Sequence, residues 1–288
     1  MVISRESSNS LKGIAVLLIL ICHMLGGGFG YRIFTPLGGI GVSIFLFLSG
    51  YGLNESFTAK GLSHFWKNKL IRLLLPYILW LIILIPVSYI MYGEILWFYR
   101  YWYIEYLFIW YFLFWILKSF VPQYSDLLLL LFAISSFFIF SNIRSEQSLS
   151  FVCGVFFSSK KNKIVCYKSD HYKFIALLSL ALGVVCLGAK QLEVLRSFGE
   201  ESLLVRSCQL GIKFPIGLAI ILFYSPKGME KIFSALGALS LEIYLVQMPL
   251  YSFISGSFTK FLVVIGVVSI LVFVLHFSSR VIIKKLAM

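Results

Sequence analysis

One apolar run near the start of the sequence contains two residues that could do chemistry, a lysine and a histidine. The run reads SLKGIAVLLILICHMLGG over residues 10–27, and the two residues are Lys12 and His23. At about 100° per residue, the eleven steps between them pass three full turns by only about 20°, so an α-helix places both side chains on one face, roughly 16 Å apart. Because an ionisable group in hydrocarbon is costly, we expect this face to line a cavity or the interior of a helix bundle.

The imidazole of His23 has the chemistry of a general base. A histidine side chain, with an ordinary pKa of about 6.5, can accept a proton from a hydroxyl at neutral pH. The stem of Lys12 can extend to the membrane surface and place its ammonium there, where it attracts anions. Each residue also has a simpler interpretation: Lys12 as an anchor at the membrane surface, and His23 as a hydrogen-bonded interior side chain.

A second basic pair follows a run of small residues. The run GGIGVSIFLFLSGYGL (38–53) favours close helix approach through its glycines and its two serines, Ser43 and Ser49. In HFWKNKLIRLLLPY (64–77), Lys69 and Arg72 are three apart and therefore neighbours on one helix face. These two residues either anchor the helix at the membrane surface or hold phosphates.

A third basic pair lies inside a later apolar run. Arg206 and Lys213 are seven apart and share a helix face, and two permanent charges in one span need a counter-charge or a charged ligand. We expect Glu242 to be the counter-charge, although Glu200 and Glu201 are closer in sequence. Structural pairing and a role at a phosphate-bearing ligand both remain open for this pair.

The elements that position these residues are predicted to be membrane-spanning α-helices. Hydrophobic residues are 60% of the 288 positions, charged residues are 13%, and the mean hydropathy is +0.93, well above a soluble domain. The pattern predicts one all-α polytopic unit over residues 1–288, without repeats or a soluble domain. About ten spans are expected: 11–27, 37–56, 70–92, 102–120, 125–141, 148–158, 172–189, 203–224, 233–255 and 259–283.

The distribution of basic residues predicts the orientation of the chain. If both termini are cytoplasmic, the cytoplasmic segments contain 17 of the 25 lysines and arginines, and the opposite side contains six. This agrees with the positive-inside rule for ten alternating spans. The net charge of +13 therefore does not indicate a nucleic-acid partner. The first run is expected to remain as a helix rather than be cleaved as a signal peptide, because no small-x-small site follows it.

The five cysteines are Cys22, Cys153, Cys166, Cys186 and Cys208. Most lie in apolar runs, and their spacing predicts neither a disulfide framework nor a metal site, so we interpret them as small buried hydrophobes.

Several phrases together resemble the acyltransferase-3 family of bacterial membrane acyltransferases. LKGIAVLLILICH (11–23) is similar to the family's L-R-G-x-A phrase, in which a basic residue precedes a histidine with ten residues between. GVSIFLFLSG (41–50) resembles G-V-x-L-F-F-x-L-S-G, and Lys69, Arg72 and Pro76 match a basic-x-x-Arg motif before proline. LGALSLEIYLVQMPL (236–250) resembles the family's small-S-x-x-x-Y-L-x-H-x-P phrase, and WYIEYL (102–107) and FVCGVFF (151–157) resemble weaker features.

The resemblance implies a multi-pass O-acyltransferase of the bacterial inner membrane. Its donor would be acyl-CoA, acetyl-CoA by family frequency, and its acceptor a hydroxyl of a cell-surface polysaccharide or of its lipid-linked precursor, with no permanently bound cofactor or metal. His23 would be the general base, or would carry the acyl group covalently. Acyl-CoA phosphates would be bound by Lys12, Lys69 and Arg72, and possible oxyanion or acceptor contacts are Ser49, Gln247, Arg206, Lys213 and Glu242.

Two residues depart from the family pattern. Lys12 replaces an arginine and so lacks the planar fork that binds phosphate through two bonds. Gln247 stands where many members have a histidine. The alternative function is transport, as a proton-coupled carrier or a flippase of a lipid-linked sugar, since an intramembrane histidine with a basic stripe also suits a translocation path. Inverted repeats with paired broken helices, which would favour a transporter, are not visible in the sequence.

Overall fold

The computed structural model describes residues 3–63, 65–93, 101–140, 142–160, 169–199, 201–225 and 228–287. The protein is 87% helical, with no strand among these residues. The all-α prediction is therefore confirmed. Several residues used in the sequence analysis lie outside the described ranges: Arg100, Lys161, Lys163, Cys166, Lys168, Glu200 and Lys227.

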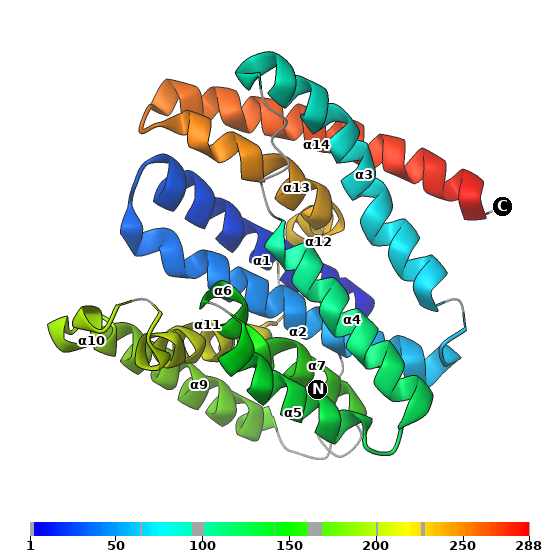
Figure 1. Ribbon diagram of the computed structural model, residues 1–288, viewed down its shortest axis with the longest axis vertical. Helices are drawn as coiled ribbons and strands as arrows, with labels where there is room; N and C mark the ends of the chain where they lie inside the picture. The colour runs from blue at the N-terminus through cyan, green and yellow to red at the C-terminus, as the bar shows by residue number, and fades with distance from the viewer. Residues whose placement is uncertain are drawn as a thin grey trace.

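The helices lie roughly side by side, with α1 and α2 in the middle of the view in Figure 1. On one side of this pair lie α13, α14 and α3, and on the other lie α5, α7, α9 and α11 (Figure 1). The elements are α1 (Arg5–Ile21), η1 (Cys22–Gly28), η2 (Arg32–Phe34), α2 (Thr35–Lys60), α3 (Phe65–Tyr92), α4 (Trp102–Phe120), α5 (Ser125–Ile139), α6 (Asn142–Ser145), α7 (Ser148–Ser159), α9 (Ser169–Ala189), α10 (Glu193–Ser197), α11 (Leu203–Phe223), α12 (Glu230–Ala238), α13 (Ser240–Leu250), η3 (Tyr251–Ile254) and α14 (Phe258–Ala287).

Seven helices in the described part of the chain are long and apolar enough to cross a membrane, or up to eight if the bent pair α12–α13 forms one span. The two members of that pair meet at 68°. The predicted spans 125–141 and 148–158 correspond to α5 and α7, which have only 15 and 12 residues. At 1.5 Å per residue neither reaches across roughly 30 Å of hydrocarbon as a straight helix. Ten crossings therefore stay a prediction.

Glycines allow the central helices to approach closely, as the run of small residues predicted. A Cβ at Gly50 of α2 would collide with the backbone oxygen of Phe151 in α7, and one at Gly154 of α7 would collide with that of Phe47. Gly13 of α1 lies in the same way against Phe233 of α12. These contacts fix α1 and α7 against their neighbours because only a glycine leaves room for the facing backbone.

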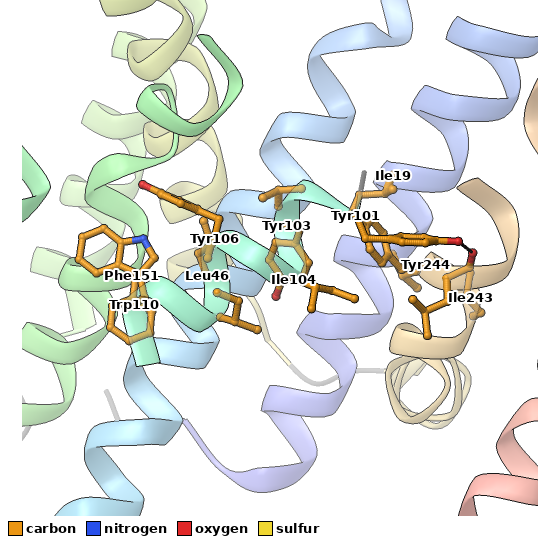
Figure 2. Packing of buried hydrophobic residues seen from close by; sticks show 14 of the residues in the cluster. Ile19, Leu46, Tyr101, Tyr103, Ile104, Tyr106, Trp110, Phe151, Ile243 and Tyr244 are labelled. Atoms are coloured by element: carbon orange, nitrogen blue, oxygen red, sulfur yellow. Dashed lines mark hydrogen bonds between the residues drawn. The ribbon is translucent and has the colours of Figure 1, made fainter. Parts of the chain in front are cut away.

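Aromatic side chains of α4 connect the two sides of the bundle. Figure 2 shows the side chains from Tyr101 to Trp110 extending between Tyr244 of α13 and Phe151 of α7. The ring of Trp110 stacks on Phe151 with centroids 5.1 Å apart. The hydroxyl of Tyr101 accepts from Trp80 Nε1 at 2.6 Å and donates to the carbonyl of Leu245 at 2.9 Å. These bonds hold α3, α4 and α13 together around the cavity described below.

The four cysteines among the described residues are free and only partly exposed. The interpretation as buried hydrophobes holds only in part, because each of the four is of intermediate exposure rather than fully buried.

Candidate active site

A cavity of about 740 Å³ lies among α1, α2, α3, α4, α13 and α14. Each helix contributes residues at helical spacing, so one face of each helix is turned to the same space. The contributions include Lys12 and Ile19 from α1, Val42, Phe45, Ser49 and Gly52 from α2, Arg72 and Pro76 from α3, Tyr103, Leu107 and Tyr111 from α4, Glu242 and Tyr244 from α13, and His276, Ser279 and Arg280 from α14.

The face of α1 that carries Lys12 and His23 is turned toward this cavity. Helix α1 begins after Ser4, whose hydroxyl accepts a hydrogen bond from the Ser7 N–H at 3.0 Å. Along the helix, Arg5, Lys12 and Ile19 line the cavity at intervals of seven residues. His23 follows Ile19 one turn later on this face and is not among the residues that line the cavity.

The main chain widens at His23. Residues Cys22–Gly28 form a π-helix that includes three successive glycines. Such turns are rare in proteins and occur frequently at functional sites.

His23 has polar atoms without hydrogen-bond partners around it. Its ring stacks on Tyr251 with centroids 5.2 Å apart, and the carboxamide of Gln247 is its polar neighbour. Among the described residues, neither Nδ1 of His23 nor Nε2 or Oε1 of Gln247 has a partner in hydrogen-bond geometry, although these atoms are buried. A buried unpaired polar atom costs about 1–3 kcal/mol, so three of them together indicate a place for a polar ligand.

A cationic cluster, formed by Arg5, Lys12, Lys69, Arg72 and Arg280, occupies the other end of the cavity. All except Lys69 line the cavity. Lys69 lies over the ring of Tyr111, 5.4 Å from its centroid, and within electrostatic reach of Lys12 and Arg72. In the ion pairs formed within the described ranges, no carboxylate contacts any of the five. Like charges that repel one another without a counter-charge are typical of an anion-binding site.

The structure places Glu242 in the cavity wall rather than beside the basic residues of α11. Its Oε1 lies 2.8 Å from Nδ1 of His276. The expected pairing of Glu242 with Arg206 and Lys213 is therefore wrong. Lys213 instead forms an ion pair with Glu146, and both side chains are largely buried. The physical reason is that α11 packs on α2, α9 and the turn before α7, whereas α13 packs on α1, α3 and α14.

Within the described ranges, Arg206 bonds to backbone carbonyls rather than to a carboxylate, and its Nε has no partner there. Its guanidinium donates to the carbonyls of Phe137 and Phe140 at 3.4 and 3.2 Å. These carbonyls belong to the end of α5, where the last turn of the helix leaves acceptors unpaired. Arg206 and Lys213 thus lie outside the cavity, and Glu201 is exposed.

Ser49, which the sequence analysis selected, lines the cavity and interacts with the hydroxyls of Tyr103 and Tyr111. These two tyrosines, like Arg5 and Arg280, are residues of the site that the sequence analysis did not select. The i, i+4, i+8 spacing of Tyr103, Leu107 and Tyr111 was a visible signal for one lining face. Arg5 and Arg280 had been counted only as basic residues of the cytoplasmic side, and nothing in the sequence joined them to Lys12.

Comparison with known proteins agrees with this geometry. A family model described as an acyltransferase domain, that of the acyltransferase-3 family, matches residues 5–279, nearly the whole chain. No curated protein and no solved structure matches the chain. The matched range includes α1 with Lys12 and His23, the cationic residues Lys69 and Arg72, and the Glu242–His276 pair. The chain therefore belongs to the acyltransferase-3 family of membrane acyltransferases.

Proposed function

We propose that this protein is an O-acyltransferase of the bacterial inner membrane that moves an acyl group, most simply acetyl, from acyl-CoA to a hydroxyl of a cell-surface polysaccharide or of its lipid-linked precursor. The observation that supports it best is the arrangement along α1. The cationic cluster, which forms no ion pair within the described ranges, lies at the cavity, and His23 follows on the same helix face, near buried polar atoms that lack hydrogen-bond partners among the described residues.

The cationic cluster suits the phosphates of the donor. Lys12, Lys69 and Arg72, with Arg5 and Arg280, offer charge-assisted hydrogen bonds to the phosphate oxygens. Lys12 and His23 are separated by roughly 16 Å along the helix axis, at 1.5 Å per residue. The long pantetheine arm of an acyl-CoA would cross that distance past Ile19 and the tyrosines, and place the thioester near the imidazole.

His23 then acts as the general base. The acceptor oxygen loses its proton to a ring nitrogen of His23 while it attacks the carbonyl carbon of the thioester. The resulting oxyanion receives a hydrogen bond from Nε2 of Gln247, which lacks a partner otherwise. The intermediate collapses, the carbon–sulfur bond breaks, and the leaving thiolate takes the proton from the imidazolium. The products are the acylated acceptor and CoA.

Transfer of labelled acetyl from acetyl-CoA to the polysaccharide of the host, in membrane vesicles, tests this proposal. We expect His23→Asn to lower the transfer rate on the order of 10²–10⁴-fold, the range for a lost general base, while CoA still binds. Arg72→Gln should instead weaken CoA binding. His171→Asn is the matched control, because His171 lies on α9, away from the cavity.

Transfer at the wild-type rate by His23→Asn protein that inserts normally would exclude His23 as the base. An Arg72→Gln protein that binds CoA with the same affinity as the wild type would exclude the cationic cluster as the donor site.

A further inference from the structure

A carboxylate in the wall of an anion-binding cavity requires a physical explanation. Glu242 is only 5% exposed and lines the same cavity as four members of the cationic cluster. When ionised it repels an incoming phosphate. Its hydrogen-bond partner in the described part of the chain is His276, through Nδ1 at 2.8 Å.

This contact orients the imidazole of His276. When one ring nitrogen is held by a carboxylate, the ring angle is fixed and the other nitrogen is presented to the surroundings. The side chain of His276 is 23% exposed and lines the cavity, and none of its described neighbours bonds to Nε2. Arg280 follows His276 by one turn of α14 and lines the cavity as well.

We propose that His276, held in place by Glu242, is a proton-dependent ligand of the donor's phosphates. This inference rests on the proposed function. As an imidazolium, His276 donates Nδ1–H to Glu242 and Nε2–H to a phosphate oxygen. As a neutral ring it still donates Nδ1–H to Glu242, but Nε2 then turns a lone pair toward the phosphate. Binding of the donor therefore takes up one proton from solvent at this ring.

The ring of His276 shares the cavity with other charged and titratable groups. Those in the cavity wall are Glu242 and Tyr244 from α13, Arg280 from α14, Arg5 and Lys12 from α1, Tyr51 and Glu55 from α2, Arg72 from α3, and Tyr103 and Tyr111 from α4, with Lys69 beside Arg72. A phosphate bound among the cations places negative charge next to the ring of His276, where an Nε2–H can donate a charge-assisted hydrogen bond to it.

The test is calorimetric titration of the full-length protein in lipid nanodiscs with CoA, which binds without reacting. Titrations at one pH, in buffers of different ionisation enthalpy, give the number of protons taken up for each CoA bound. At one fixed pH we expect the wild type to take up more protons for each CoA bound than His276→Gln. With rising pH the CoA affinity of the wild type should fall more steeply than that of His276→Gln, by up to about tenfold more per pH unit, the limit for one additional linked proton.

Two further variants keep the test decisive. His276→Arg carries a fixed charge in place of the titrating ring, so its CoA affinity should fall less steeply with rising pH than that of the wild type. His171→Gln, outside the cavity, should follow the wild type. A His276→Arg protein whose affinity still falls with pH as steeply as the wild type would overturn the inference, even if His276→Gln did not fold.

The outcome also separates this inference from the proposed function. If Arg72→Gln weakens CoA binding and His276→Gln takes up as many protons as the wild type, the donor site stands and the role of His276 is wrong. If CoA binds equally to the wild type and to Arg72→Gln at every pH, the donor site itself is wrong.

Discussion

Two ion pairs with well-buried carboxylates occur among the described residues, and they differ in what surrounds them. The Glu242–His276 pair borders the cavity, whereas the Lys213–Glu146 pair is enclosed between α11, α2 and the turn before α7. The stem of Lys213 also covers Gly39 of α2, where a Cβ would collide with it. We therefore assign the Lys213–Glu146 pair a structural role and the Glu242–His276 pair a role in binding.

The structural role predicts an asymmetric effect of substitution. Lys213→Met leaves the Glu146 carboxylate buried without a partner, which should lower the free energy of unfolding by about 3–5 kcal/mol. Combining Lys213→Met with Glu146→Leu removes both charges and should restore most of that loss. Thermal midpoints in detergent micelles measure both effects. Equal midpoints for the single and the double variant would show that the pair does not act as a unit.

At the scale of the helices, glycine positions determine which pairs pack together. Gly50 and Gly154 lie where α2 and α7 cross, and each faces the backbone of the other helix. Gly266 of α14 differs, because a Cβ there would meet no atom within 4 Å. The same residue type is therefore required at the crossing and free to change on the exposed face of α14.

We expect Gly50→Ala to separate α2 from α7 and to destabilise the protein by about 1–3 kcal/mol, as overpacking does in other cores. Gly266→Ala should be neutral or stabilising by up to about 1 kcal/mol, since alanine restricts the unfolded chain and favours a helix. The thermal midpoints of the two variants, measured side by side, check this. Similar midpoints would mean that α2 and α7 are not packed through these glycines.

Much of the helical architecture could be predicted from the sequence, because hydropathy and helical period are local properties. The spacing of Lys12 and Ile19 on α1 and the glycines of α2 were informative for the same reason. Which charged side chains form ion pairs could not be predicted in this way, because the partners come from separate parts of the chain: Glu242 pairs with His276, and Lys213 pairs with Glu146. Which charges meet depends on which helices pack, and no spacing within one helix contains that information.

For the molecule as a whole, the positions of the N-terminal helix α1 and the C-terminal helix α14 agree with an even number of membrane crossings. Arg5 at the start of α1 and Arg280 near the end of α14 line the same cavity. At the opposite end, the N–H of Gly256, just before α14, donates to the carbonyl of Gly28 at 2.8 Å. In Figure 1 the α1–α2 and α13–α14 connections lie together on the left, whereas the C-terminus lies on the right. Together with positive-inside counting, this arrangement predicts that both termini lie in the cytoplasm.

Labelling of single cysteines in intact cells with a membrane-impermeant maleimide tests this topology, in a background without native cysteines. We expect Arg32→Cys to be labelled in intact cells and Lys284→Cys only after permeabilisation. Gln123→Cys and Ile143→Cys decide whether α5 crosses, since they lie before and after it at exposed positions. With ten crossings Gln123→Cys is protected and Ile143→Cys is labelled. If both are protected, α5 and α7 enter the bilayer without crossing it and the chain crosses eight times, an even number that keeps the cationic cluster on the side predicted to be cytoplasmic.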